Sequence, residues 1–257
     1  MKPAVLAIVQ ARMGSRRLPG KVLAPIGSKS ILVRVLERLS SARHIDATLV
    51  ATTTWPEDDV IERVSTLSGF PVFRGNTFDV LDRFYCAVEN RPEQIFVRVT
   101  SDCPLVSPAL VDETISALIE NNADYASNAR PYSTFPEGLD VEAFRRGALV
   151  RAWQEATRTS DREHVTPYIW RQPDRFRLAS IRCPDVLPRV RLTIDEPADL
   201  AYMQALFQFV DAAHMPWRSV VAWAAAHRNQ LPDNLFIPRD AGYLQCLAEE
   251  SDHASTH

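Results

Sequence analysis

The N-terminal part of the chain carries a run of basic and small residues that could bind an anion. Residues 7–21 read Ala-Ile-Val-Gln-Ala-Arg-Met-Gly-Ser-Arg-Arg-Leu-Pro-Gly-Lys. Gly14 can let backbone N–H groups approach an anion closely, while Arg12, Arg17 and Lys21 supply positive charge. The run matches neither the P-loop pattern nor the dinucleotide-binding glycine pattern. It predicts a phosphate-binding loop of another kind, with an ordinary basic turn as the alternative.

Two aspartates that follow short apolar segments could bind a divalent cation. Asp102 ends the run Arg98-Val-Thr-Ser-Asp, and Asp195 ends the run Arg191-Leu-Thr-Ile-Asp. Taken alone, each aspartate could serve only a turn or the cap of a following helix. Together, two carboxylates at strand ends beside a basic loop suit Mg²⁺, which prefers oxygen ligands and commonly combines one or two carboxylates with substrate phosphates.

Alternating apolar and amphipathic segments must position these residues. The pattern predicts strands at 5–9, 47–53, 72–73, 94–99 and 125–127, and helices at 31–39, 60–67, 80–88 and 108–119. Such alternation indicates an α/β fold with right-handed crossovers, a mainly parallel sheet and helices on both faces. Ligands of such sheets bind beyond the carboxyl ends of the strands, where the basic loop and both aspartates are expected.

The alternation breaks at about residue 129. Residues 130–138 are rich in turn formers and aromatic residues, which predicts an excursion over the binding edge at about 129–145. Strands are expected again near 176–181 and 191–194, and helices from about Pro197 and Pro216. A capping-box pattern, Ser160 with Glu163, predicts the start of another helix. No repeat or linker is visible, so one domain over 1–248 is favoured, followed by a flexible polar tail at 249–257.

Composition narrows the function classes. With 257 residues, 46% apolar and 24% charged, disordered, collagen-like and coiled-coil classes are disfavoured. The apolar runs at 4–9 and 220–226 are far shorter than the roughly 20 residues of a membrane helix, so no membrane insertion is expected. A strand-like segment that begins at residue 4 leaves no room for a signal peptide, which favours a cytoplasmic location.

Charge is distributed unevenly along the chain. The net charge of −3 gives no general attraction to nucleic acid, and no nucleic-acid partner is expected. Residues 1–45 nevertheless carry nine basic side chains against one acidic side chain, Glu37. This local excess favours an anionic small molecule near the N-terminus. The four cysteines form no CxxC pair, which argues against a zinc site or a disulfide framework.

Several motifs, in order, resemble one enzyme family. The first loop is similar to the A-R-x-x-S-x-R-L-P-G-K signature of the cytidylyltransferases that make CMP-activated acidic sugars, the CMP-KDO and CMP-sialic acid synthetases. The nearest likeness is to the spore coat polysaccharide biosynthesis protein F branch, over most of residues 4–205. Its marks are Gln10-Ala-Arg-Met-Gly-Ser15, Arg74-Gly75 with Asp79-Val-Leu and Arg83, Ser101-Asp-Cys-Pro-Leu105, Gly138-Leu-Asp-Val-Glu142, Arg162-Glu-His-Val-Thr-Pro167 and Arg191-Leu-Thr-Ile-Asp195. The chain departs from the family pattern at Ser101, where glycine is common, and at Arg16, where a smaller residue is usual.

The resemblance implies a Rossmann-like nucleotidyltransferase (GT-A-like) fold. It also implies Mg²⁺-dependent transfer of CMP from CTP to a sugar acid, sugar phosphate or related acceptor, with release of pyrophosphate, for surface polysaccharide biosynthesis. A homodimer is expected by family likeness. Arg12, Lys21 and Asp102 would be catalytic, with Asp102 and Asp195 binding the metal. The nucleotide-binding residues would be Gln10, Ala11, Arg12, Met13, Gly14, Ser15, Arg17, Lys21, Arg74 and Arg98.

The same resemblance places the acceptor-binding residues later in the chain. They would be Glu137, Asp140, Glu142, Arg162 and His164. Asp140 and Glu142 are two apart on an expected strand and would share a face. His164 is either a general base or, as the alternative, a packed and hydrogen-bonded histidine. Arg74, Asp79 and Arg83 lie either near the nucleotide or at a subunit contact, with a surface ion pair between Asp79 and Arg83 as the simpler alternative.

Two other functions compete with this one. A glycosyltransferase on a related nucleotide-sugar fold would commonly use a D-x-D metal motif, and the corresponding position here reads Ser101-Asp-Cys. A non-catalytic homologue could bind a nucleotide and serve as a partner subunit. The presence of Lys21, Asp102 and Asp195 argues against such a loss of activity.

Overall fold

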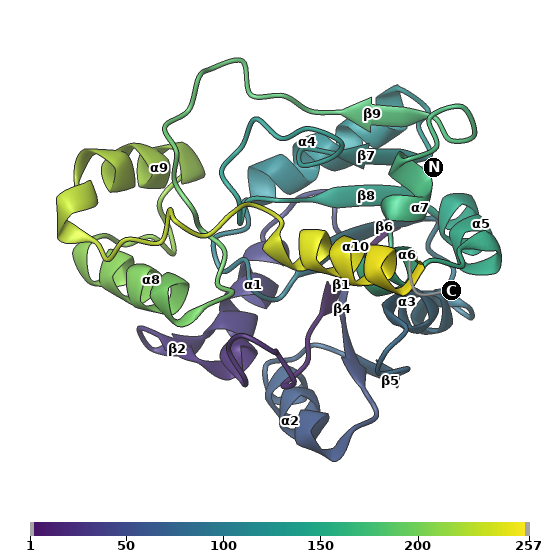
Figure 1. Ribbon diagram of the computed structural model, residues 1–257, viewed down its shortest axis with the longest axis horizontal. Coiled ribbons are helices and arrows are strands. Elements are labelled where there is room, and N and C mark those ends of the chain that lie inside the picture. Colours follow the sequence, from purple (N-terminus) through teal and green to yellow (C-terminus); the bar gives the residue numbers. More distant parts are fainter. Residues whose placement is uncertain (1–2, 255–257) are drawn as a thin grey trace.

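A seven-stranded sheet with helices on both faces forms the centre of the computed structural model, which describes residues 3–254 (Figure 1). The strands lie in the order β5-β4-β1-β6-β8-β7-β9. Strand β8 runs antiparallel to its neighbours β6 and β7, whereas the other neighbouring strands are parallel. The bounds are β1 (Val5–Gln10), β4 (Ala47–Thr53), β5 (Val72–Gly75), β6 (Ile95–Thr100), β7 (Tyr125–Ser127), β8 (Glu142–Arg145) and β9 (Leu178–Ser180).

Side chains of β1 alternate between two apolar cores, one on each face of the sheet. Val5, Ala7 and Val9 pack under one helix layer, and Leu6 and Ile8 under the other. The first layer consists of α1 (Ile31–Leu39), α2 (Asp59–Leu67) and α4 (Pro108–Glu120), and the second of α3 (Val80–Val88), α5 (Arg146–Glu155) and α7 (Pro167–Trp170). Because both faces are covered, the central strands are apolar at nearly every position.

Helix starts follow from local chemistry. The Ser30 hydroxyl accepts a hydrogen bond from the Val33 N–H at 3.4 Å and caps α1. Ser107 caps α4 in the same way, and Pro108 occupies the first turn, where its missing N–H costs nothing. The capping box expected at Ser160 and Glu163 is wrong. Helix α6 (Thr159–His164) begins after Arg158 without a side-chain cap, because Ser160 instead hydrogen-bonds Glu250 at 2.9 Å.

A third apolar cluster lies beside the sheet and holds the segment 191–195. It joins α8 (Pro197–Phe209) and α9 (Trp217–Ala226) to the short hairpin β2 (Pro25–Ile26) and β3 (Lys29–Ser30). Gly138, at φ 99°, passes so close that an added Cβ would lie 2.3 Å from the Leu192 carbonyl carbon. Only glycine fits there, since a side chain would push residues 137 and 192 apart.

The fold class predicted from the sequence is confirmed, and several elements have their predicted bounds. These are the helices at 31–39 and 80–88 and the strands at 47–53 and 125–127. The strand predicted at 191–194 is wrong, because this segment makes only an isolated bridge between Glu137 and Arg191. The excursion predicted at 129–145 ends earlier, because residues 142–145 form β8 between β6 and β7. Asp140 therefore precedes the strand that it was expected to share with Glu142.

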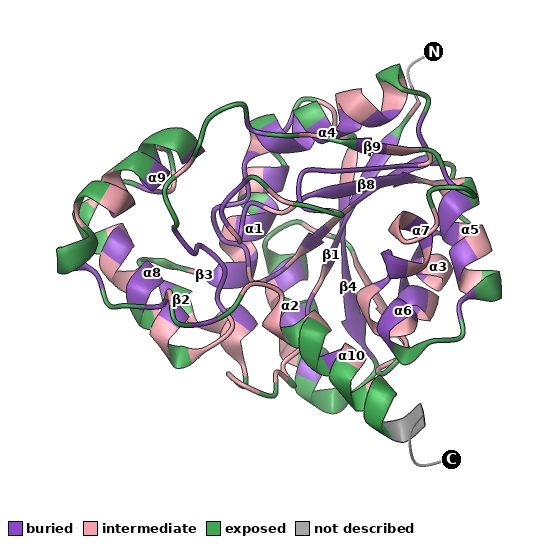
Figure 2. Cartoon of the chain, turned by 45° about the horizontal axis from the view of Figure 1, so that its top comes forward, coloured by how far each residue is buried: buried purple, intermediate pink, exposed green. Residues whose placement is uncertain are grey.

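The flexible tail predicted from residue 249 overlaps the end of a helix in the residues described. Residues 249–254 belong to α10 (Ala241–Ala254), which packs beside α6 (Figure 1). Most of the outward surface of α10 is exposed, while the strands beneath are buried (Figure 2). Two polar contacts join this part of α10 to the rest of the chain: Glu250 binds Ser160, and Glu249 binds Arg16. Residues 255–257 lie outside the described residues. Within 3–254, no helix is both long and apolar enough to cross a membrane.

Candidate active site

A cavity of about 310 Å³ opens at the edge of the sheet where β1 and β6 end. Its wall is formed by the loop after β1, the loop after β6, the start of β8, α6, and the first turns of α10. Parallel strands bring their carboxyl ends to one edge, which is why segments far apart in sequence meet there. Thirteen of the residues proposed from the sequence lie in this wall: Gln10, Ala11, Arg12, Ser15, Arg17, Lys21, Arg98, Asp102, Glu137, Asp140, Glu142, His164 and Asp195.

Lys21 is the central group of the cavity. It begins the short helix η1 (Lys21–Leu23), and its Nζ donates to Asp102 Oδ2 at 2.8 Å, to Asp195 Oδ1 at 2.9 Å and to the Ile194 carbonyl at 2.8 Å. Burial opposes the charge of Lys21, but the two carboxylates raise its pKa above 10.5. Burial likewise opposes ionisation of Asp102, yet Lys21 lowers its pKa to about 2. Both partners are therefore charged at neutral pH.

Asp195 is held in place by cations on three sides. Besides Lys21, Arg17 Nη2 lies 3.1 Å from its Oδ1 and Arg191 Nη2 lies 2.9 Å from its Oδ2. Asp195 does not cap the following helix, because Glu196 and Asp199 form the capping box of α8. The Ile194 N–H donates to the Asp102 carbonyl at 2.9 Å, which ties the two aspartate-bearing segments together.

The donor set fits a hard divalent cation. Asp102 and Asp195 come from two segments, face the same cavity and supply carboxylate oxygens, the ligands that Mg²⁺ prefers. Both already gather around one positive charge, the Lys21 ammonium. Their side chains are 21% and 19% exposed, so oxygen atoms of both remain accessible from the cavity. These two aspartates are therefore the residues that would hold the metal.

Arg191 anchors the Asp195 segment from inside the protein. It is 3% exposed, and its guanidinium binds Glu137, Asp195 and Asp199, the last of which is fully buried. Asn234 adds a hydrogen bond to Asp199 at 3.0 Å. Buried charges of this kind are stable only when paired, so the network fixes the position of Asp195 relative to Glu137.

The acidic residues that were expected to bind the acceptor are all paired. Glu142 accepts hydrogen bonds from Arg98, from the Tyr125 hydroxyl at 2.6 Å and from Thr166. Arg98 in particular lowers the Glu142 pKa against the effect of burial. Asp140 pairs with Arg239 at 2.5 Å. Glu137 pairs with Arg191 and accepts the Asp240 N–H at 3.0 Å, while burial raises its pKa to about 7.

His164 has a free hydrogen-bonding atom inside the wall. Its buried Nε2 has no hydrogen-bond partner. The His164 and Tyr243 rings pack edge to face, with their centroids 5.1 Å apart. The next residue, Val165, has φ 71° and ψ −53°, and the Thr166 N–H donates to the His164 carbonyl at 2.8 Å. This is the rare, strained form of γ-turn, and strain of this kind clusters at functional sites. A substrate hydroxyl could supply the missing partner.

His164 also gives a testable pH dependence. Burial, and then the nearby Arg98 and Arg130 cations, lower its pKa from 6.5 to about 4. The folded state thus favours the neutral imidazole, and this contribution is complete above pH 6.5 and lost as the pH falls toward 4. We expect wild type to lose about 2 kcal/mol more stability than His164→Gln between pH 7.5 and pH 5, measured by urea unfolding. If the free energy of unfolding fell equally with pH in wild type and His164→Gln, the lowered pKa of His164 would be contradicted.

A pKa of about 4 makes His164 a weak general base at neutral pH, because proton acceptance is most effective when the pKa lies near the working pH. The ring packs against Tyr243, as the alternative expected, but its Nε2 lacks the hydrogen bond that the alternative also expected.

Four residues proposed from the sequence do not line the cavity in the described part of the chain: Met13, Gly14, Arg74 and Arg162. The Met13 N–H donates to Asp58 Oδ1 at 2.7 Å, and a Cβ on Gly14 would lie 2.9 Å from Glu57 Oε1. Met13 and Gly14 therefore lie against residues 57–58, outside the cavity lining.

The two arginines of this group bind elsewhere. Arg74 pairs with Asp59 and Glu62 on α2. Arg162 pairs with Asp79 at 2.6 Å and so joins α6 to α3. The surface ion pair considered between Asp79 and Arg83 is absent from the described residues, because Asp79 is engaged by Arg162 and caps α3.

Residues within 240–249, at the start of α10, also line the cavity, and the sequence alone did not predict this. Asp240 binds Arg130 with two hydrogen bonds, at 2.6 and 2.7 Å, and has φ 58°. The Arg130 guanidinium carbon lies 5.8 Å from the centroid of the Trp170 ring and 5.7 Å from that of the Tyr243 ring. No local motif marks residues 240–249 as part of a site, because they reach the cavity only through tertiary contacts.

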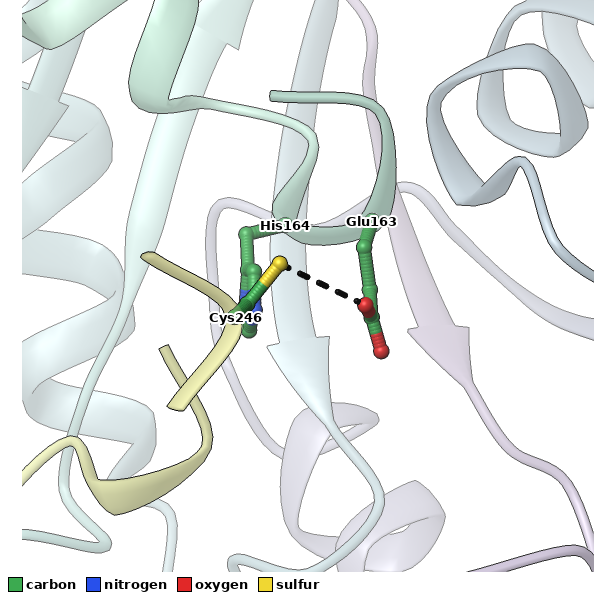
Figure 3. Close-up of side chains that lie close together, drawn as sticks. All are labelled: Glu163, His164 and Cys246. Carbon is green, nitrogen blue, oxygen red and sulfur yellow. Dashed lines mark hydrogen bonds between the residues drawn. The ribbon is translucent and has the colours of Figure 1, made fainter. Parts of the chain in front are cut away.

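A cluster of Glu163, His164 and Cys246 joins α10 to α6 (Figure 3). Their ligand-type atoms all lie within 4.8 Å of one another, and the Cys246 thiol donates to Glu163 Oε2 at 3.7 Å. Burial and the Glu163 charge raise the Cys246 pKa to about 11, so the thiol keeps the proton that it donates. Glu163 also lies 3.7 Å from Arg12, which links α10 indirectly to the basic loop.

Comparison with known proteins places this architecture in a family. A family model described as Cytidylyltransferase matches residues 6–214. The chain is 35% identical over 211 residues to the spore coat polysaccharide biosynthesis protein SpsF of Bacillus subtilis, covering 79% of this chain and 86% of that protein. It is 32% identical over 145 residues to a 3-deoxy-manno-octulosonate cytidylyltransferase of Neisseria meningitidis, covering 54% and 55% of the two chains. A solved cytidylyltransferase structure from Leptospira borgpetersenii superposes with a TM-score of 0.83 at 27% identity. The superposition covers 91% of this chain and 98% of that chain.

Proposed function

The chain belongs to the cytidylyltransferase family, and from this premise we propose that it transfers CMP from CTP to a sugar acid, sugar phosphate or related acceptor in surface polysaccharide biosynthesis. The observation that carries the proposal is the convergence of Lys21, Asp102 and Asp195 beside a basic loop in one cavity. A paired carboxylate site with adjacent cations suits a polyphosphate with its metal.

In the proposed reaction, an acceptor oxygen attacks the α-phosphorus of CTP. The new oxygen–phosphorus bond forms as the bond between the α-phosphorus and the bridging oxygen breaks, and pyrophosphate leaves with that oxygen. A hydroxyl acceptor releases its proton to solvent or to a nearby base. Such transfers depend on positioning and charge neutralisation more than on covalent work by the protein.

The cavity residues have distinct tasks in this proposal. Arg12, Arg17 and Lys21 hold the phosphates and neutralise the charge that develops on the leaving pyrophosphate. Asp102 and Asp195 would hold Mg²⁺, which when bound supplies Lewis-acid charge stabilisation to phosphate oxygens. Glu137, Asp140 and His164 line the same cavity, and we assign them to the acceptor.

Pyrophosphate release tests the function. Purified protein is incubated with CTP, Mg²⁺ and a panel of acidic sugars, sugar phosphates and phosphonates, with reactions lacking acceptor or metal as controls. We expect release that needs CTP, metal and at least one acceptor together. Binding of CTP without release for any member of the panel would favour a non-catalytic nucleotide-binding homologue. Transfer of a sugar from a nucleotide sugar would instead favour a glycosyltransferase.

The expected homodimer stays a prediction. Light scattering coupled to size-exclusion chromatography measures it directly, with 28.9 kDa as the mass of one chain.

A further inference from the structure

Glu163 and Cys246, which the proposed reaction leaves unused, lie beside His164 in the cavity wall. A carboxylate oxygen, an imidazole nitrogen and a sulfur of the three residues lie within 4.8 Å of one another. Glu163 and His164 extend from the end of α6, and Cys246 meets them from α10 (Figure 3). Thiolate, imidazole and carboxylate are the ligands that bind Zn²⁺ in proteins, whereas Mg²⁺ takes oxygen ligands. The donor set is therefore that of a second metal, different from the one expected at the paired aspartates.

The spacing of these atoms suits a tetrahedral ion. With a Zn–S distance of about 2.3 Å and a Zn–O distance of about 2.0 Å, the sulfur and oxygen ligands of Zn²⁺ lie about 3.5 Å apart. Cys246 Sγ lies 3.7 Å from Glu163 Oε2, so these two atoms need almost no movement. The metal takes the place of the thiol proton in this hydrogen bond, and the proton passes to solvent.

His164 is suited to be the third ligand. A metal binds the neutral imidazole through a ring nitrogen that is free to accept. Burial, and then the Arg98 and Arg130 cations, lower the pKa of His164 to about 4, so its ring is neutral at pH 7. Its Nε2 is buried and has no hydrogen-bond partner. Both arginines are themselves paired with carboxylates, which limits their repulsion of a metal ion.

Negative charge gathers around the sulfur. After burial, the charges of Glu163, Glu250 and Glu249 are what raise the pKa of Cys246 to about 11. The same charges attract a divalent cation. Arg12, 3.7 Å from Glu163 in a pair that is 37% exposed on each side, is the cation that a metal would replace. Three protein ligands leave the fourth position of a tetrahedral ion open, and the cluster lines the cavity, where a further molecule can reach it.

We infer that Glu163, His164 and Cys246 form a binding site for Zn²⁺ or another thiol-binding divalent metal, and that the bound ion inhibits the enzyme by closing the acceptor part of the cavity. The inhibition rests on the function proposed above, which assigns His164 to the acceptor. With its ring nitrogen on the metal, His164 no longer binds an acceptor hydroxyl. Zn²⁺ is therefore expected to raise the KM for the acceptor more than the KM for CTP.

Co²⁺, a coloured substitute for Zn²⁺, tests the site without any measurement of activity. In excess Mg²⁺ and a phosphine reductant, we expect Co²⁺ to give wild type the near-ultraviolet absorption of a Co²⁺–thiolate bond, and Zn²⁺ to abolish it. Cys246→Ser should lose this absorption. Cys86→Ser, which removes a thiol on α3 outside the cavity lining, should keep it. No such absorption in wild type, or absorption that survives in Cys246→Ser, would overturn the inference.

Glu163→Gln tests the site with the thiol in place. We expect this variant to bind Co²⁺ at least about tenfold more weakly, because even a group that only supports a metal ligand is worth about 10–100-fold in affinity. Unchanged affinity would refute the three-ligand site, and this result stays informative if Cys246→Ser fails to fold.

Pyrophosphate release tests the inhibition, with an acceptor that supports the reaction. Zn²⁺ should inhibit wild type and Cys86→Ser alike, and Cys246→Ser should need at least about tenfold more Zn²⁺. Inhibition that extra Mg²⁺ relieves equally in all three proteins would place Zn²⁺ at Asp102 and Asp195 and refute the inhibitory site. Failure of the proposed function has a different signature: wild type without Zn²⁺ releases no pyrophosphate with any acceptor, while the Co²⁺–thiolate absorption still appears. That result would refute the inhibition and support the metal site.

Discussion

Replacing Lys21 with alanine is expected to lower turnover with CTP and an active acceptor by about 10²–10³. The reason is that the Lys21 ammonium contacts both Asp102 and Asp195 and lines the cavity proposed for the phosphates. Removing one preorganised donor at a developing charge costs about 3–4 kcal/mol at the transition state. Steady-state pyrophosphate release measures the effect.

Lys29→Ala is the matched control for this experiment. Lys29 lies on the hairpin strand β3, pairs with Glu37, and is 44% exposed, away from the cavity lining. Its loss should leave turnover unchanged, because an exposed ion pair contributes little. Normal turnover in Lys21→Ala would refute the catalytic role of Lys21, provided that its thermal unfolding matches that of wild type.

Replacing Arg191 with methionine is expected to destabilise the fold by about 3–5 kcal/mol. The substitution keeps much of the side-chain volume but leaves Asp199, fully buried, without its cation. Glu137 and Asp195 lose a partner at the same time. Chemical denaturation measures the loss of free energy, and the melting temperature should fall by roughly 10 °C for a chain of this length.

Two further variants show whether the buried charge is the cause. Adding Asp199→Asn to Arg191→Met removes the unpaired carboxylate and should recover part of the stability, so the two changes should not be additive. Arg228→Met breaks an exposed pair with Asp233 at 3.7 Å and should cost less than 1 kcal/mol. Additive losses in the double variant would mean that packing, not charge pairing, explains the effect.

The sequence predicted the parallel part of the sheet because that part follows local rules. Residues 47–53 are apolar and β-branched, and residues 31–39 carry a stripe at helical spacing behind a serine cap. A strand was expected to hold both Asp140 and Glu142, but β8 begins only at Glu142. Its place between β6 and β7 could not be predicted, because it depends on pairing partners distant in sequence. Helix α10 escaped prediction because its polar residues bind other polar residues.

The difference between local rules and tertiary contacts also explains which site residues could be predicted from the sequence. Asp102 and Asp195 were predicted to meet because the end of a parallel strand fixes where a side chain lies. The structure brings them together even though residues 192–194 form no strand. Arg74 and Arg162 illustrate the limit of motif reasoning: both belong to the family-like motifs, yet both point toward acidic residues outside the cavity lining. A motif identifies a residue without giving the direction of its side chain.

The segment that carries Arg239, Asp240 and Tyr243 lies beyond residue 214, where the match to the family model ends, yet it buttresses Glu137, Asp140 and His164. A late stretch of the chain thus supports residues of the cavity that lie within the family match. Chimeras that exchange this stretch between homologues offer a way to test its influence on acceptor choice, provided that Glu249, which pairs with Arg16 of the basic loop, is kept. For the same reason, a purification tag is better placed at the other end of the chain.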